Sequence, residues 1–212
     1  MQIISHRGYW KSEDEKNTFI SFERSFNLGF GTETDIRDQN GKLVISHDPP
    51  LGECMSLFEF LALFDSINPN LPLALNIKSD GLLPFVKREL DCFPRILNYY
   101  FFDMAVPDSM GYINNQMPVL TRRSEYEGSS MLDAKSAGIW LDCFHSLWYD
   151  NKFLQSLLLT TKKVFIVSED LHGRNPDSHW SQLKKWNVHK SDNIIICTDY
   201  PETCNTYFNN EN

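Results

Sequence analysis

Residues 4–8 read Ile-Ser-His-Arg-Gly, residues 31–35 read Gly-Thr-Glu-Thr-Asp, and residues 43–50 read Leu-Val-Ile-Ser-His-Asp-Pro-Pro. In each segment a β-prone run carries ionisable side chains at or near its end. Such groups are costly to bury unless they meet a metal ion or an anion. The stretch 6–50 is therefore expected to place a metal or anion site at the ends of its strands.

Strand-like and helix-like segments alternate along the whole chain, and no linker or change of composition divides them. Apolar residues recur at helical spacing over 17–28, and Asn40-Gly41 is a turn signal between two strands. About eight strand–helix units in a single pass indicate a parallel sheet covered by helices. We predict an α/β fold, a single compact (β/α)8 (TIM) barrel, with residues 1–212 forming one domain.

Composition limits the classes of partner. The chain has 212 residues, is 42% hydrophobic and carries a formal net charge of −8. An acidic balance argues against a broad nucleic-acid surface, although a few local cations can still bind a small anion. Five cysteines without framework spacing indicate reduced thiols. With no leader-like start and no apolar run of roughly 20 residues, we predict a cytoplasmic protein without stable membrane insertion.

Glu33 and Asp35 form the sharpest acidic pair. Residues two apart on a strand project from the same face, and two carboxylates that close repel unless a cation lies between them. Carboxylate oxygens suit a hard divalent ion, Mg²⁺ or Ca²⁺. Spacing alone slightly favours an exposed edge strand with solvated acids. Gly31 and the flanking histidine segments shift the interpretation toward a metal site.

His6 and His47 are candidates for an acid–base pair. In a parallel barrel the active site forms at the carboxyl ends of the strands, and both histidines follow strand-like runs. Histidine can accept or donate a proton near neutral pH, as phosphodiester cleavage requires. A single histidine after a strand is more often a satisfied structural group. Arg7 can bind a phosphate with two hydrogen bonds, and Gly8 allows close backbone approach.

Taken together, these segments resemble the glycerophosphodiester phosphodiesterase family. The matching elements, in order, are His-Arg-Gly at 6–8, Asn-Thr at 17–18, Glu-x-Asp at 33–35 and His-Asp-x-Pro at 47–50, with looser agreement at 75–78 and 198–202. The resemblance implies a (β/α)8 barrel and a phosphoric diester hydrolase of lipid metabolism. It also implies a divalent metal on Glu33 and Asp35, and acid–base roles for His6 and His47.

Two positions depart from the pattern of that family. Lys16 stands where the family has a glutamate before Asn-Thr, and Asn76 stands where it has a third acidic metal ligand. An amide oxygen can ligate Mg²⁺ or Ca²⁺ but brings no charge, so weaker metal binding is expected. Asp80 or Asp103 could compensate. Lys78 shares the face of Asn76 and either meets a phosphate or forms a salt bridge at the rim.

The second half of the chain holds a segment that the resemblance does not explain. Residues 168–174 read Ser-Glu-Asp-Leu-His-Gly-Arg and follow a strand-like run. His172 and Arg174 offer a hydrogen-bond donor and an anion clamp, so we assign them to substrate binding. A solvated loop with a glycine turn explains the segment equally well. Arg122 and Arg123, after a predicted strand at 118–120, are weaker candidates of the same type.

The leading hypothesis is a metal-dependent phosphodiesterase that acts on a small glycerophosphodiester or a similar phosphodiester. Arg7, His6 and His47 would be catalytic, and Glu33, Asp35 and Asn76 would hold the metal. Lys78, His172 and Arg174 would bind the substrate. One alternative keeps the site but changes the substrate to a phosphosugar or glycan-precursor phosphodiester. A second alternative is a barrel that binds a phosphorylated ligand without cleaving it.

Overall fold

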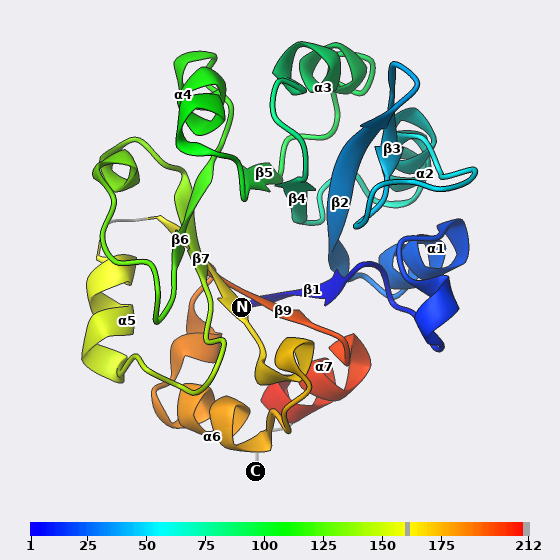
Figure 1. The fold of residues 1–212 in the computed structure, drawn as a ribbon. Coiled ribbons are helices and arrows are strands. Elements are labelled where there is room, and N and C mark those ends of the chain that lie inside the picture. The colour runs from blue at the N-terminus through cyan, green and yellow to red at the C-terminus, as the bar shows by residue number, and fades with distance from the viewer. Residues whose placement is uncertain (160–161, 210–212) are drawn as a thin grey trace. The chain divides into compact units, whose positions relative to one another are not determined.

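The computed structural model describes residues 1–159 and 162–209. Strands and helices alternate along the described chain (Figure 1). The strands are β1 (Gln2–His6), β2 (Gly31–Gln39), β3 (Lys42–Ile45), β4 (Leu73–Ile77), β5 (Tyr99–Phe102), β6 (Leu120–Arg123), β7 (Gly138–Leu141), β8 (Lys163–Val167) and β9 (Ile194–Thr198). The α-helices are α1 (Phe19–Asn27), α2 (Leu57–Ile67), α3 (Leu83–Leu90), α4 (Val106–Asn114), α5 (Asn151–Leu158), α6 (Asp177–Lys185) and α7 (Pro201–Asn209).

The sheet follows the order β5-β4-β2-β1-β9-β8-β7-β6, and β3 pairs with β2 outside this order. Pairs β2–β4, β4–β5, β6–β7, β7–β8 and β8–β9 are parallel. The strand order is that of a (β/α)8 barrel, so the predicted fold class is confirmed. The chain divides into two compact units, an N-terminal unit (Ser5–Val119) and a C-terminal unit (Met1–Ile4 with Leu120–Asn212). A single domain over 1–212 stays a prediction.

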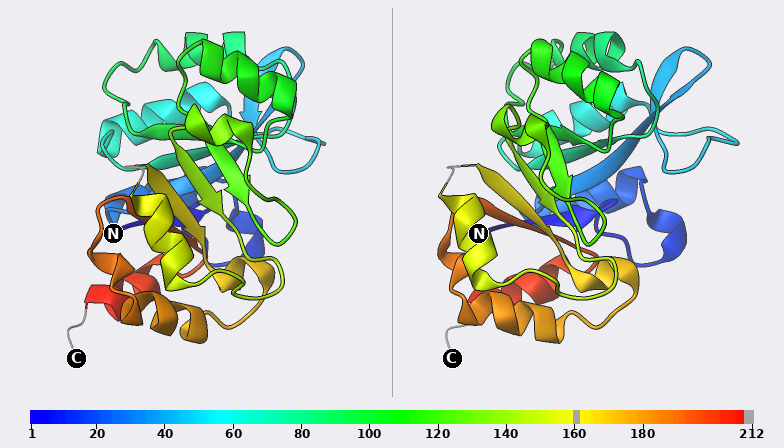
Figure 2. Two further views of the ribbon diagram at one scale, coloured as in Figure 1. Left: turned by 90° about the vertical axis from the view of Figure 1, so that its left-hand side faces the viewer. Right: turned by 60° about the vertical axis from the view of Figure 1, so that its left-hand side comes forward.

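Aromatic side chains between α1 and α2 fill much of the core of the N-terminal unit. The ring of Phe22 lies 4.8 Å from that of Phe60, and the ring of Phe26 lies 4.9 Å from that of Phe64. All four side chains are buried, as expected for the apolar face of an amphipathic helix. Figure 2 shows these helices lying outside the strands of their unit. Residues of β2 and β4 belong to the same buried cluster, so the aromatic packing holds these two strands in place.

Strand β3 is an antiparallel addition to the eight-stranded order. It pairs with the far half of β2, from Ile36 opposite Ile45 to Gln39 opposite Lys42. The connecting residues Asn40 and Gly41 have φ angles of 51° and 77°, as a tight hairpin turn requires. The return strand then brings Ser46 back to Asp35, whose carbonyl accepts the Ser46 N–H at 3.0 Å. The hairpin therefore places His47, the residue after Ser46, close to Asp35.

In the C-terminal unit, the predicted bounds of one strand are wrong. Strand β6 spans Leu120–Arg123 rather than 118–120, so Arg122 and Arg123 lie within the strand. Charged residues can continue this strand because each finds a carboxylate. Arg122 pairs with Asp142 at 2.9 Å, and Arg123 pairs with Asp133.

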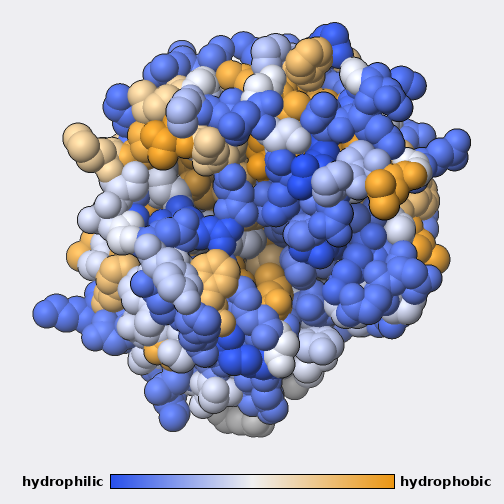
Figure 3. Space-filling model, in the orientation of Figure 1, coloured by the Kyte–Doolittle hydropathy of each residue, from blue (hydrophilic) through white to orange (hydrophobic). Residues whose placement is uncertain are grey.

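The surface and the helix lengths agree with the acidic, polar composition. The face in Figure 3 is covered mostly by hydrophilic side chains, with apolar side chains in small groups. None of the helices in the described part of the chain combines the length and the apolar character needed to cross a bilayer.

Candidate functional site

Strand β2 carries two buried carboxylates on one face. Glu33 is 3% exposed and Asp35 is fully buried. Burial, followed by the nearby charge of Asp35, raises the pKa of Glu33 from 4.5 to about 7. A bound cation would favour the ionised form of both acids.

Asn76 adds a third oxygen on the neighbouring strand. It lies directly opposite Asp35 in the β2–β4 pairing, so both side chains project from the same face. Glu33 Oε2, Asp35 Oδ1 and Asn76 Oδ1 are buried, and none accepts a hydrogen bond from the described residues. In the described chain, no group of three or more His, Cys, Asp and Glu side chains could hold a metal ion; the three oxygens here come from two carboxylates and an amide. The donor set fits a hard divalent ion.

Two cations and an amide surround Asp35. Arg7 Nε lies 3.1 Å from Asp35 Oδ2, and Lys78 Nζ lies 3.4 Å from Asp35 Oδ1. Asn17 Nδ2 donates to Asp35 Oδ2 at 2.9 Å, and its own Oδ1 accepts from Thr34 at 2.8 Å. Sequence reasoning gave Asn17 no role beyond the motif. The structure shows that it orients the second acid of the pair.

The first histidine lies beside the first acid. His6 ends β1, and its Nε2 lies 3.9 Å from Glu33 Oε2. The next residue, Arg7, has a φ of 58°, and its carbonyl accepts the N–H of Asn17 at 2.9 Å. This turn places His6, Arg7 and the acids of β2 in one neighbourhood of the N-terminal unit.

The second histidine is held by its own neighbour. His47 Nδ1 lies 3.0 Å from Asp48 Oδ1. An ionised carboxylate only accepts, so Nδ1 carries the hydrogen and Nε2 is the atom that can exchange a proton. Arg37 donates to the carbonyls of His47 at 2.9 Å and Lys78 at 3.2 Å. Arg37 therefore ties the two loops together, a role that sequence spacing did not indicate.

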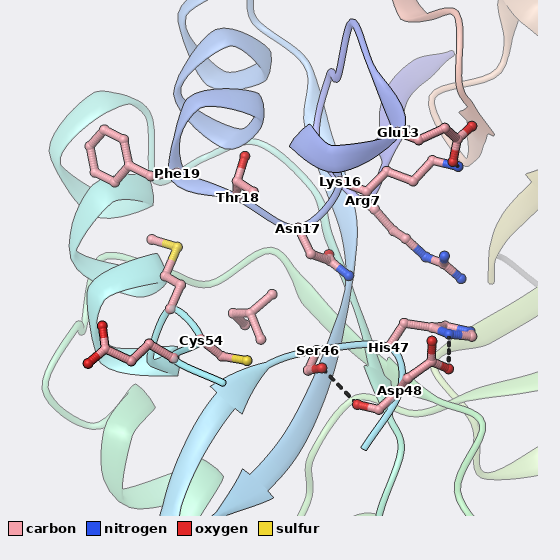
Figure 4. A pocket seen from close by; sticks show the side chains of 13 residues that line it. Arg7, Glu13, Lys16, Asn17, Thr18, Phe19, Ser46, His47, Asp48 and Cys54 are labelled. Atoms are coloured by element: carbon pink, nitrogen blue, oxygen red, sulfur yellow. Dashed lines mark hydrogen bonds and ion pairs between the residues drawn. The ribbon is translucent and has the colours of Figure 1, made fainter. Parts of the chain in front are cut away.

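A cavity of about 530 Å³ opens beside these groups in the N-terminal unit. Arg7, Asn17 and His47 line it, together with apolar side chains such as Phe19 and Met55. Figure 4 shows Arg7 and His47 extending in the same direction from separate segments. The cavity therefore offers a cation and a proton carrier to a ligand of small-molecule size.

The C-terminal unit holds a second polar cluster. His172 Nε2 lies 2.7 Å from Asp142 Oδ1, and Arg122 pairs with the other oxygen of this buried acid. Arg174 donates to the carbonyls of Cys143 at 2.5 Å and Phe144 at 2.6 Å, and it lies 3.6 Å from Glu169. These contacts brace the chain after β7. The substrate roles of His172 and Arg174 stay predictions.

Comparison with solved structures identifies related folds over nearly the whole chain. An Oleispira antarctica phosphodiesterase, in complex with the product sn-glycerol-3-phosphate, matches with a TM-score of 0.76 and 17% identity, covering 99% of this chain and 97% of that one. A glycerophosphodiester phosphodiesterase from Parabacteroides distasonis gives 0.72 and 17%, covering 98% and 96%. No protein-family model and no curated protein sequence matches.

The chain has the fold of the glycerophosphodiester phosphodiesterases. The resemblance predicted from the motifs is thereby confirmed at the level of the fold. A Ca²⁺-dependent phosphatidylinositol-specific phospholipase C from Streptomyces antibioticus shares it more distantly, with a TM-score of 0.58, 10% identity, and coverage of 98% of this chain and 96% of that one.

Within this glycerophosphodiester phosphodiesterase fold, Lys16 is the departure that the structure explains most directly. Its Nζ pairs with Glu13 Oε2 at 2.6 Å and lies 4.3 Å from the centre of the Trp10 ring. The side chain lines the cavity as a cation instead of the acid that the family pattern carries. Glu13 lines the same cavity, so the Lys16–Glu13 ion pair places both a cation and its counter-charge near Arg7.

The backbone of Gly8 packs closely against Ser21, next to the residues of the site. A Cβ at this position would lie 2.3 Å from Ser21 Oγ, and its φ is +81°. We expect Gly8→Ala to destabilise the protein by about 3–5 kcal/mol, because it combines a clash with left-handed strain. Gly29 has the same φ and nothing within 4 Å of its Cβ position. Gly29→Ala should cost only about 1–2 kcal/mol in urea unfolding. Equal losses would contradict the clash.

Proposed function

We propose that this protein is a metal-dependent phosphodiesterase that hydrolyses a small glycerophosphodiester or a similar phosphodiester. One observation carries the proposal. Three buried oxygen atoms, on Glu33, Asp35 and Asn76, share one face of two neighbouring strands and accept no hydrogen bond from the described chain, and the Asp35 oxygen has the Lys78 ammonium 3.4 Å away. The fold shared with phosphodiesterases supports the same reaction class.

The proposed roles follow from the placement of the side chains. A divalent ion, Mg²⁺ or Ca²⁺, held by Glu33, Asp35 and Asn76 would neutralise charge on the phosphoryl oxygens. Arg7 and Lys78, which both face Asp35, would bind the phosphate oxygens as developing charge builds up. These two cations already balance the acids, so a bound ion adds the positive charge that an anionic substrate needs.

His6 and His47 would divide the proton transfers. One takes the proton of the attacking group, which is water or a neighbouring hydroxyl of the substrate, and the other protonates the leaving alkoxide. His47 exchanges its proton at Nε2, because Asp48 holds Nδ1. The Nε2 atom of His6 lies 3.9 Å from Glu33 Oε2.

The first experiment titrates Mg²⁺ and Ca²⁺ into the metal-free protein by calorimetry and assays glycerophosphocholine hydrolysis in parallel. We expect one ion to bind and to stimulate hydrolysis, and EDTA to remove the activity, because both depend on the three oxygens. A wild-type protein that shows neither binding nor metal-stimulated hydrolysis contradicts the proposal.

The second arm of the assay distinguishes the substrates. Sugar phosphodiesters are supplied under the same conditions as glycerophosphocholine. Turnover of sugar phosphodiesters alone would identify the phosphosugar alternative. Binding of the ion and of glycerol phosphate without turnover of any diester would identify a non-catalytic barrel.

A further inference from the structure

The third oxygen of the metal site has a partner on another strand end. Asn76 Nδ2 donates to Asp103 Oδ2 at 3.1 Å. A carboxylate can only accept, so the amide nitrogen must face Asp103 and the amide oxygen must face away from it. That oxygen, on a side chain only 6% exposed, is the one that accepts no hydrogen bond from the described residues. The hydrogen bond to Asp103 therefore leaves the Asn76 side chain with its oxygen, not its nitrogen, available to a ligand.

The backbone at Asp103 is unusual for a residue with a side chain. Its φ is +68°, directly after β5, where glycine would fit without strain. Phe102, the residue before it, is the register partner of Asn76. Aspartate and asparagine enter this region more readily than most other residues with a side chain, so the φ angle is compatible with Asp103 but does not select it. The turn alone does not require an aspartate.

We infer that Asp103 is a positioning residue for the metal site. It holds the Asn76 amide with its oxygen toward the ion, and from the position directly after β5 it supplies the negative charge that an amide in place of an acidic ligand lacks. The inference rests on the proposed function, since it requires the ion. Partners that orient a metal ligand raise its basicity, and their loss typically weakens metal binding about 10–100-fold.

Asp103→Gly is the first test. Glycine adopts the same φ, so we expect the melting temperature in EDTA to stay at the wild-type value or rise. We expect affinity for Mg²⁺ or Ca²⁺, measured by calorimetry, to fall about 10–100-fold. Gln116→Gly is the matched control, because Gln116 is an exposed residue of the same unit with a φ of 60°. It should leave the affinity unchanged.

An exchange of the two side chains is the second test. In the double variant Asn76→Asp with Asp103→Asn, the amide at position 103 donates to a carboxylate at position 76. The two side chains keep their sizes and their hydrogen bond, and the negative charge moves to the residue that would bind the ion. We expect this double variant to bind the ion at least as tightly as wild type. Asn76→Asp alone sets two carboxylates at hydrogen-bond distance, and it should bind more weakly than the double variant at neutral pH.

The outcomes separate the inference from the proposed function. Wild-type affinity in Asp103→Gly overturns the orienting role, and an exchange variant weaker than wild type overturns the charge role. A wild-type protein that binds neither ion overturns the proposed function and this inference together. Wild-type binding with an unaffected Asp103→Gly leaves the proposed function standing and overturns the inference alone.

Discussion

Replacing Glu33 by glutamine is expected to stabilise the metal-free protein at pH 8 and to weaken metal binding strongly. The Glu33 pKa is raised by burial and by Asp35, to about 7. A carboxyl with a raised pKa is neutral in both states at low pH, and it costs stability only above its unfolded pKa. The pKa difference corresponds to up to about 3 kcal/mol at pH 8 and less than about 1 kcal/mol at pH 5.

The measurement is thermal unfolding in EDTA at both pH values. Glu33→Gln should melt several degrees above wild type at pH 8, and the gain should shrink at pH 5. Glu23→Gln, on the exposed side of α1, is the control and should change neither melting temperature. Metal affinity should fall more than about 100-fold, since a charged ligand is lost. A stability difference independent of pH would contradict the role of Glu33.

Replacing His47 by glutamine is expected to lower kcat about 10²–10⁴-fold with little change in stability. The His47 side chain is 41% exposed, and its ring contacts Asp48 rather than the metal-site oxygens. Metal affinity should therefore stay near wild type.

His6→Gln should cause a loss of similar size, because both proton transfers are needed. Lys42→Gln, an exposed change on the same hairpin as His47, is the control and should keep full activity. Retained activity in both histidine variants would falsify the acid–base assignment. Loss of metal binding in His47→Gln would instead give this residue a place among the ligands.

Local sequence rules predicted much of the N-terminal unit. The 17–28 pattern gives α1, whose capping box joins Thr18 and Ser21, and Asn40-Gly41 gives the hairpin turn. The Glu-x-Asp spacing predicts that both acids share one face of the strand, although spacing alone favoured a solvated edge and the structure buries them. These features are short-range, so residue spacing determines them.

Contacts between residues far apart in the chain could not be predicted from the spacing of residues in the sequence. Asn76 and Asp103 are 27 residues apart, and Arg37 reaches the Lys78 carbonyl across 41 residues. Strand β6 was misplaced because Arg122 and Arg123 look like loop residues until their carboxylate partners are known. The substrate roles of Lys78, His172 and Arg174 also depend on tertiary arrangement, and they remain to be tested by variants.

The β2–β3 hairpin limits how the segment carrying His47 can change during evolution. Side chains alternate along a strand, so losing or gaining one residue in β3 turns every later side chain to the opposite face. Paired changes of two residues on each side of Asn40-Gly41 preserve both the pairing of Ile36 with Ile45 and the hydrogen-bonded pair that closes the two-residue turn. The ribbon can therefore lengthen or shorten at its tip in such paired steps while His47 keeps its place, which leaves the tip open to divergence among related chains.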